Sequence, residues 1–484
     1  MRKHFYCLLA MFASCLVSPL SQVQAQTTPA TWQEHWFEHV QLLQRVYLDN
    51  DLALYYDNDV SRSVTWPNQF LSDVWRYTKK TYGSFGTEPQ LYAVMHTNKY
   101  SGGHPSTYFD ASHDFRNVID AGPGNWTGAT EGDHNLLTHE VGHIVEIGSK
   151  NTHGSPAFGI WGDSKWAEIY IYDVYKGLGL TTYQNSVYTQ FTAGRDNFPR
   201  ANTAWFRDWF YPIYNQYGGT QVLNRYFVQV ALYFARSGSE YNGGMNMGEF
   251  VHFWSGAAGV NLKSLATTAF GWTSEYETQF VQAQQKYPFT YSTPKPIVAS
   301  LFQDINYGGY GVYLPEGNYN LTTLRAYGAR NDDVTSLKVA AGYRVTFYMD
   351  DNFTGSSKVF TADAASMEAG WNDQVSSIRV EKLAAATVSV APEEKDGLSV
   401  SSDKGLVVFP NPVSRGSSLT VRVTEYDAKA PLKVSLVDVN KTPVVYQTAN
   451  AATVSVNTGN VAGGVYVLVV TNGSRYYTKK IVVQ

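Results

Sequence analysis

The run Thr138-His139-Glu140-Val141-Gly142-His143 carries two imidazoles and a carboxylate at a spacing that suits metal-assisted hydrolysis. On a helix, His139 and His143 project from one face, so both can bind a single Zn²⁺ ion. Glu140 lies one step round the helix and can accept a proton from a water in the open coordination position. Zinc lowers the pKa of such a water toward neutrality, which prepares it to attack a carbonyl group. The sequence therefore predicts a zinc hydrolase with Glu140 as general base.

The residues around this run predict a buried helix, because apolar side chains recur through positions 136–147. Asp133 and Asn135 are candidate N-terminal caps, and Gly148 is a natural end. Buried polar groups need partners, and a metal ion would satisfy them. Gly142 removes a side chain where a substrate or a neighbouring strand would approach.

A catalytic zinc ion needs a third protein ligand. Residues 163–175 predict a second helix that ends near Gly177, and Glu168 lies in its first turns. Glu168, His153 and Asp163 are the candidates for this ligand.

These residues resemble the gluzincin branch of the zincin metallopeptidases, in which HExxH is followed by a glutamate ligand on a later helix. The resemblance implies a peptidase with Zn²⁺ held by His139, His143 and Glu168, and with Glu140 as base. Many members carry an aspartate one turn after the ligand glutamate, where it supports the metal site. Asp173 lies one place beyond that position, which leaves this role open.

The run His35-Trp36-Phe37-Glu38-His39 spells the inverted motif HxxEH. It lies in an amphipathic stretch that predicts a helix over about 35–47, and no convincing partner glutamate accompanies it. We therefore interpret this run as a structural helix rather than a metal site.

The chain begins with a predicted export signal over residues 1–25, because a basic start precedes an apolar run and small residues lead up to Ala25. Cys7 and Cys15 both fall inside it, so the mature chain would have no disulfide. No transmembrane segment is expected in the mature chain. With 37 basic and 41 acidic residues, the net charge of -4 gives no electrostatic case for binding nucleic acid.

Residues 26–292 predict an α+β, zincin-like catalytic domain. A helix is expected over 68–81 and strands over 90–96 and 117–121, all before the zinc helix. The later pattern is helical over 205–217, 222–236, 247–255 and 275–286. Four further histidines are candidates to line the cleft, although each fits an ordinary polar role: His104, His113, His134 and His252.

Residues 297–383 contain a repeat. The run Phe302-Gln303-Asp304-Ile305-Asn306-Tyr307-Gly308-Gly309 returns as Tyr348-Met349-Asp350-Asp351-Asn352-Phe353-Thr354-Gly355, and each copy is followed by an Asn-Asp-x-x-Ser/Thr-Ser run. This pattern resembles an all-β βγ-crystallin domain built from two Greek keys. In that family the second run binds Ca²⁺, since closely spaced carboxylate, amide and hydroxyl oxygens suit a hard cation. The candidate calcium ligands are Asn331, Asp332, Thr335, Asn372, Asp373 and Ser376.

Residues 384–404 are small and polar and predict a linker. From residue 405 to 484 the chain is rich in β-branched residues, opens with Phe409-Pro410-Asn411-Pro412 and ends with Lys479-Lys480-Ile481-Val482-Val483. It resembles the sorting domain of the type IX secretion system, found in Bacteroidetes, with an immunoglobulin-like sandwich fold. The resemblance implies export by the type IX secretion machinery and a secreted or surface-attached product.

Taken together, the sequence predicts a multidomain secreted zinc metallopeptidase that cleaves peptide bonds in a protein or glycoprotein. The alternative is a cell-surface adhesin or glycan-binding protein with a structural or inert zincin domain, and the intact Glu140 argues against it. A zinc hydrolase acting on a bond other than a peptide amide is a third hypothesis.

Overall fold

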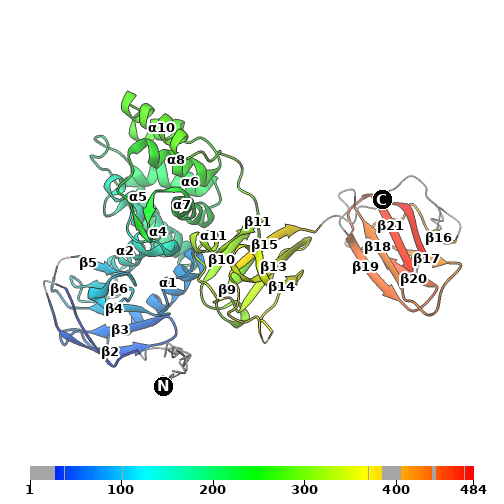
Figure 1. Cartoon of the computed structure of the whole chain (residues 1–484), viewed down its shortest axis with the longest axis horizontal. Helices are drawn as coiled ribbons and strands as arrows, with labels where there is room; N and C mark the ends of the chain where they lie inside the picture. Colours follow the sequence, from blue (N-terminus) through cyan, green and yellow to red (C-terminus); the bar gives the residue numbers. More distant parts are fainter. Residues whose placement is uncertain are drawn as a thin grey trace, which may run out of the picture. The chain divides into compact units, whose positions relative to one another are not determined.

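A computed structural model describes residues 28–36, 39–100, 102–368, 370–383, 405–438, 443–459, 461–473 and 475–484. The predicted signal peptide and the linker over 384–404 lie outside the described residues. The chain divides into two compact units, of which the first extends to Lys382 (Figure 1). Within the described ranges, no helix is long and apolar enough to cross a membrane.

The first unit opens with a mixed sheet of six strands in the order β1-β2-β3-β4-β6-β5. Strands β3, β4 and β6 are parallel, whereas β5 runs antiparallel to β6 at one edge. Every residue of β3, β4 and β6 is buried, as expected for strands that are covered on both faces. The strands are β1 (Thr31–Gln33), β2 (Leu42–Leu48), β3 (Leu52–Tyr56), β4 (Leu91–Met95), β5 (Gly103–Ser106) and β6 (Val118–Ala121).

Strand β2 occupies the place where the sequence predicts a helix over 35–47, so that prediction is wrong. The backbone of β2 pairs with both β1 and β3, and these ladders satisfy its hydrogen-bonding groups. Leu43 is buried while its neighbours Leu42 and Gln44 are exposed, which is the alternation of a strand. Pairing between segments overrides the helical pattern here.

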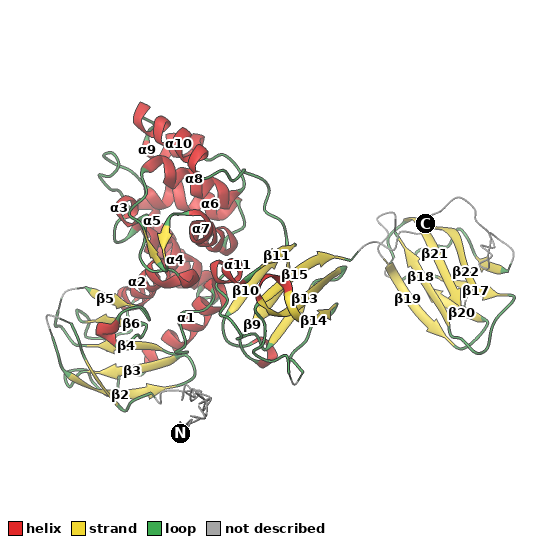
Figure 2. Ribbon diagram, viewed as in Figure 1, coloured by secondary structure: helices red, strands yellow, loops and turns green. Residues whose placement is uncertain are grey.

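Two helices cover one face of this sheet, α1 (Trp66–Tyr82) and α2 (Glu131–Gly148) (Figure 2). Ile119 and Ala121 of β6 share the large hydrophobic core with apolar residues of both helices. The opposite face carries a separate, smaller core that includes Trp32 and Val118. Each face of the sheet therefore packs against its own hydrophobic core.

A helical region follows α2. The predicted helices are confirmed, the first of them as a π-helical turn (Phe206–Phe210) that continues into α6. Helices α3, α5 and α9 are additional. The helices are α3 (Phe158–Trp161), α4 (Lys165–Gly177), α5 (Thr181–Ala193), α6 (Tyr211–Gln216), α7 (Thr220–Tyr233), α8 (Met247–Ala258), α9 (Lys263–Phe270) and α10 (Ser274–Lys286), with a small hairpin of β7 (Arg236–Ser237) and β8 (Glu240–Tyr241).

The repeat region forms two antiparallel sheets, β10-β9-β12 and β11-β15-β13-β14. Strand β11 belongs to the first copy of the repeat but pairs with β15 of the second, which interlocks the two copies. Its elements are β9 (Ile297–Phe302), β10 (Gly311–Pro315), β11 (Gly317–Tyr319), α11 (Leu321–Ala326), β12 (Ser336–Val339), β13 (Tyr343–Asp350), β14 (Thr354–Phe360) and β15 (Ser377–Lys382).

The repeat region packs against the mixed region within the first unit. Lys150 donates hydrogen bonds to the carbonyl oxygens of Tyr82 at 2.5 Å and Tyr327 at 3.4 Å. At the same contact, a Cβ on Gly83 would lie 2.7 Å from the Cα of Gly328, so only glycine permits this approach.

The second unit is a sandwich of two antiparallel sheets, β16-β17-β20 and β19-β18-β21-β22, around one apolar core. Its strands are β16 (Leu406–Phe409), β17 (Ser418–Val423), β18 (Leu432–Val437), β19 (Pro443–Ala449), β20 (Thr453–Asn457), β21 (Gly464–Asn472) and β22 (Arg475–Val483).

Candidate functional site

Helix α2 holds the HExxH run and begins one turn earlier than its predicted caps. Thr130 is the N-cap and accepts a hydrogen bond from the backbone N–H of Asp133, whose carboxylate accepts one from the N–H of Thr130 in return. Asn135 is not a cap but accepts a hydrogen bond from the hydroxyl of Tyr175 at 2.7 Å. The predicted end at Gly148 is confirmed.

Gly142 serves the packing of α2 against α4. A Cβ at this position would lie 2.9 Å from Cδ1 of Tyr170, and Trp166 donates a hydrogen bond to the Gly142 carbonyl oxygen at 3.0 Å. The neighbour that requires glycine is therefore helix α4, rather than the strand or substrate expected from the sequence. This close packing brings the start of α4 beside the two histidines.

His139 and His143 point at one place. Their Nε2 atoms lie 3.0 Å apart, and Asp163 places its Oδ1 3.2 Å from Nε2 of His143 and its Oδ2 3.6 Å from Nε2 of His139. Ligand atoms around a tetrahedral zinc ion with bonds of about 2.0–2.1 Å lie about 3.3 Å from one another. These three side chains therefore fit a zinc ion.

Glu168 lines the same pocket as His139 and Asp163, but it is not among the three side chains whose ligand atoms converge. Its nearest charged partner is Lys165, at 3.9 Å. Burial raises the pKa of the Glu168 carboxyl to about 7. His153 lies elsewhere, with Nδ1 2.6 Å from the carboxylate of Glu240. Glu168 as a ligand stays a prediction, and Asp163 is the closer carboxylate.

The surroundings of the two histidines shift their pKa values in opposite directions. Burial and then the nearby His143 lower the pKa of His139 to about 4, which favours the neutral imidazole that a metal requires. Burial also opposes the charged form of His143, but the hydrogen bond and charge of Glu146 outweigh it and raise the pKa of His143.

Glu146 is a candidate site residue that the sequence reasoning missed. Its Oε2 lies 3.1 Å from Nδ1 of His143, and its Oε1 accepts a hydrogen bond from the indole of Trp161. A carboxylate on the outer nitrogen of a ligand histidine fixes the tautomer that presents Nε2 to the metal. The i, i+3 spacing of His143 and Glu146 was the available signal.

Glu140 is buried, with 3% of its surface exposed, and lies against the edge strand β5. A Cβ on Gly103 would come within 2.3 Å of the Glu140 side chain, so these two residues are in direct contact. Burial raises the pKa of the Glu140 carboxyl to about 7, and its Oε2 has no hydrogen-bond partner. Glu140, His139 and Gly103 all line one cavity of about 420 Å³.

Other candidate residues lie outside this cavity. Asp173 is fully buried and accepts hydrogen bonds from the hydroxyls of Tyr77, Tyr214 and Thr220, so it links helices rather than supporting the candidate metal site. The four further histidines also lie outside the residues that line the cavity: His104, His113, His134 and His252.

The two predicted calcium runs meet across the repeat region. Ser376 Oγ lies 3.3 Å from Oδ1 of Asp332, and Thr335 Oγ1 lies 3.4 Å from Oδ1 of Asp373. Each potential site thus combines an aspartate from one run with a hydroxyl from the other. Asn331 and Asn372 each donate to the carboxylate that follows them, at 2.6 Å in both copies. The sequence predicted these residues, but it did not predict that each aspartate pairs with a hydroxyl of the other run.

Residues 407–484 match the family described as the secretion system C-terminal sorting domain. Development-specific protein S of Myxococcus xanthus is 36% identical over 81 residues, which are 17% of this chain and 46% of that protein. Its homolog from the same organism is 33% identical over 81 residues, which are 17% of this chain and 46% of that homolog. The chain thus spans about half the length of these curated relatives.

Among solved structures, a βγ-crystallin domain from Flavobacterium johnsoniae is 44% identical and covers 18% of this chain and 94% of its own, with a TM-score of 0.17. The N-terminal domain of protein S is 34% identical over 18% of this chain and 97% of its own, also with a TM-score of 0.17. The chain contains a βγ-crystallin domain and a secretion sorting domain, and it is a secreted or cell-surface protein.

Proposed function

We propose that this protein is a secreted zinc metallopeptidase that acts on proteins or glycoproteins. The observation that carries the proposal is the convergence of His139, His143 and Asp163. Of these, His139 and Asp163 line one open cavity together with the buried Glu140. A purely structural metal site has no use for a base beside its ligands, so the position of Glu140 favours catalysis.

Each side chain has a chemical task in this proposal. His139, His143 and one carboxylate would hold zinc, which supplies Lewis acidity and a water of lowered pKa when bound. Glu140 takes the proton of the attacking water and passes it to the leaving amine. Glu146 holds the imidazole of His143 in the tautomer that ligation needs.

The edge of the sheet favours a peptide as substrate. As far as the structure describes it, β5 pairs only with β6, and its first residue Gly103 lines the cavity. An extended peptide can add to such an edge through backbone hydrogen bonds, which would place its carbonyl groups beside Glu140.

The third ligand is a carboxylate near the start of α4, and the geometry favours Asp163 over Glu168. Zinc content measured on Asp163→Asn and Glu168→Gln decides between them. We expect Asp163→Asn to lower zinc affinity at this site and Glu168→Gln to retain it. Loss of zinc only in Glu168→Gln would restore the ligand set expected from the sequence.

The experiment that tests the function compares the full mature chain with Glu140→Gln in a casein hydrolysis assay. We expect Glu140→Gln to keep its zinc and lose about 10²–10⁴-fold in rate, because general-base catalysis contributes about that much. Zinc binding without hydrolysis in the wild type would instead support a binding protein. Equal activity in both proteins would contradict the mechanism.

We also propose that the βγ-crystallin domain binds Ca²⁺ at two sites. The first would use Asp332 and Ser376, and the second Asp373 and Thr335, with Asn331 and Asn372 beside them. Burial and then the charge of Asp373 raise the pKa of Asp332, so a cation would relieve the repulsion between these carboxylates.

A further inference from the structure

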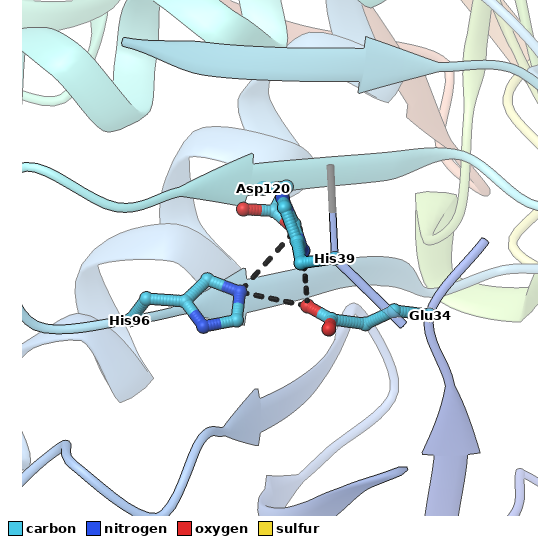
Figure 3. A group of neighbouring side chains, drawn as sticks. All are labelled: Glu34, His39, His96 and Asp120. Atoms are coloured by element: carbon cyan, nitrogen blue, oxygen red, sulfur yellow. Dashed lines mark ion pairs between the residues drawn. The ribbon is translucent and has the colours of Figure 1, made fainter. Parts of the chain in front are cut away.

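Four side chains with metal-ligand chemistry meet on the face of the six-stranded sheet that is opposite α2 (Figure 3). Asp120 lies in β6 and shares its face with Val118 of the smaller core, while His96 directly follows β4. Glu34 and His39 come from the segment between β1 and β2. The HxxEH motif thus contributes His39 to this cluster, together with residues that lie far along the chain.

All four side chains are withdrawn from water. The exposed fractions are 1% for Glu34, 4% for His39, 0% for His96 and 1% for Asp120. Buried atoms of all four make no well-directed hydrogen bond: Oε1 of Glu34, both ring nitrogens of His39, Nε2 of His96 and Oδ2 of Asp120. Several of these atoms approach one another closely but lack the directions of a hydrogen bond. Buried carboxylates are costly unless paired or bound to a metal.

The distances between the ligand atoms match a small ion. Glu34 Oε1 lies 2.7 Å from Nε2 of His96 and 3.1 Å from Nδ1 of His39. Asp120 Oδ2 lies 3.5 Å from Nε2 of His96 and 3.8 Å from Nδ1 of His39. A tetrahedral zinc ion with bonds of about 2.0–2.1 Å sets ligand-to-ligand distances of about 3.3 Å, within this range.

Neighbouring groups orient the four side chains. Nδ1 of His96 lies 3.0 Å from Oδ2 of Asp57, which fixes the tautomer with a free Nε2, and Lys99 balances Asp57 at 3.0 Å. The other oxygen of Glu34 accepts the backbone N–H of Gln41 at 2.8 Å. A carboxylate on the outer nitrogen of a histidine ligand is the usual support of a zinc site.

A charge-paired cluster without metal is the rival explanation. Burial lowers the pKa of His96, but the neighbouring carboxylates of Asp120 and Glu34 outweigh it and raise that pKa to about 10. A protonated His96 would therefore satisfy part of the cluster. Its single positive charge would balance only one of the two buried carboxylates, Glu34 and Asp120, so a second positive charge would be needed.

We propose that Glu34, His39, His96 and Asp120 form a second, closed metal site that binds one divalent transition-metal ion, with Zn²⁺ the ion that this donor set and spacing fit. Two carboxylates and two neutral imidazoles balance the charge of such an ion. All four positions are filled by buried protein groups, so the ion is structural: it fastens the segment between β1 and β2 to the sheet. Both cysteines lie within residues 1–25, so after signal cleavage no disulfide could cross-link the chain, and this ion would supply a cross-link instead.

The test measures zinc per chain by mass spectrometry on the full mature protein in zinc-saturated and then dialysed buffer. The double variant His139→Ala/His143→Ala removes the proposed catalytic site, so any remaining zinc reports the second site. Into this background we place Asp120→Asn, which keeps the shape of the side chain and removes its charge. His252→Ala, the loss of a buried histidine elsewhere, is the matched control.

We expect two zinc ions per chain in the wild type, one in the double variant, none after Asp120→Asn and one after His252→Ala. One zinc in both the wild type and the double variant would support this site and would contradict zinc binding at the proposed catalytic site. One zinc in the wild type and none in the double variant would overturn this proposal and leave the peptidase proposal standing.

Cobalt substitution keeps the proposal testable if Asp120→Asn fails to fold. The double variant should bind one Co²⁺ with the strong visible absorption of a tetrahedral site. A chelator should remove this absorption and lower the melting temperature, and added zinc should restore the melting temperature. Absence of bound cobalt in a folded double variant would overturn the site.

Discussion

The contact between Gly103 and Glu140 gives a sharp prediction for Gly103→Ala. The added Cβ would lie 2.3 Å from Cδ and 2.4 Å from Oε1 of Glu140, whereas ordinary contacts begin at 3.4 Å. The carboxylate must therefore retreat by about 1 Å, since the backbone of β5 is held by its pairing with β6. Gly103 is not among the glycines with positive φ, so alanine adds no backbone strain.

A misplacement of about 1 Å at a catalytic group costs on the order of 100-fold in rate, which corresponds to about 2.7 kcal/mol of transition-state stabilisation. We expect kcat in the casein assay to fall by about that factor in Gly103→Ala. Zinc content should stay unchanged, because no metal ligand moves. The fall in kcat at saturating substrate separates displacement of the base from obstruction of binding, which would raise KM instead.

Gly159→Ala is the matched control, since it adds the same methyl group elsewhere in the first unit and meets no atom within 4 Å. Wild-type kcat in Gly103→Ala, beside an inactive Glu140→Gln, would refute the reasoning. It would mean that the working carboxylate of Glu140 does not lie against β5.

Three further predictions concern other parts of the first unit. Glu146→Gln should weaken zinc binding by about 10–100-fold, measured by chelator competition, because His143 loses its negative partner; unchanged affinity would contradict this role. Burial lowers the pKa of Lys150 to about 7, below its unfolded value of about 10.4. Between these two pKa values the unfolded chain binds more protons than the folded one. The free energy of unfolding, measured in urea, should therefore rise from pH 7 to pH 10 more steeply in the wild type than in Lys150→Met. Parallel pH profiles for the two proteins would contradict this prediction. Asp373→Asn should lower calcium affinity by about tenfold in calorimetric titration, whereas the exposed Glu381→Gln should not; equal effects of the two would argue against the site.

Much of the fold was predictable because its patterns are local. The apolar periodicity of the sequence predicts the helix that holds His139 and His143. The two copies of the crystallin repeat have the same local backbone, with positive φ at both Asn306 and Asn352. The segment over 35–47 was mispredicted as a helix. Its amphipathic pattern fits both periods over a short stretch, and only pairing with β1 and β3 decides in favour of a strand.

The candidate sites divide in the same way. A spacing of four residues on one helix brings His139 and His143 together whatever the rest of the chain does, and Glu140 comes with them. The choice between Asp163 and Glu168 depends on how α4 packs on Gly142, and no local pattern contains that information.

The sequence by itself determined the sorting domain, the crystallin repeat and the HExxH helix, because each lies within a continuous run whose meaning depends on spacing alone. Only the tertiary structure decided that His39 of a discounted motif meets Glu34, His96 and Asp120. These residues come from three places along the chain, and strand order brings them to one face of the sheet. The same holds for the calcium runs, where Asp332 finds its hydroxyl partner in the other copy of the repeat. Ligands that converge across a sheet are set by topology and register, which a linear pattern does not specify.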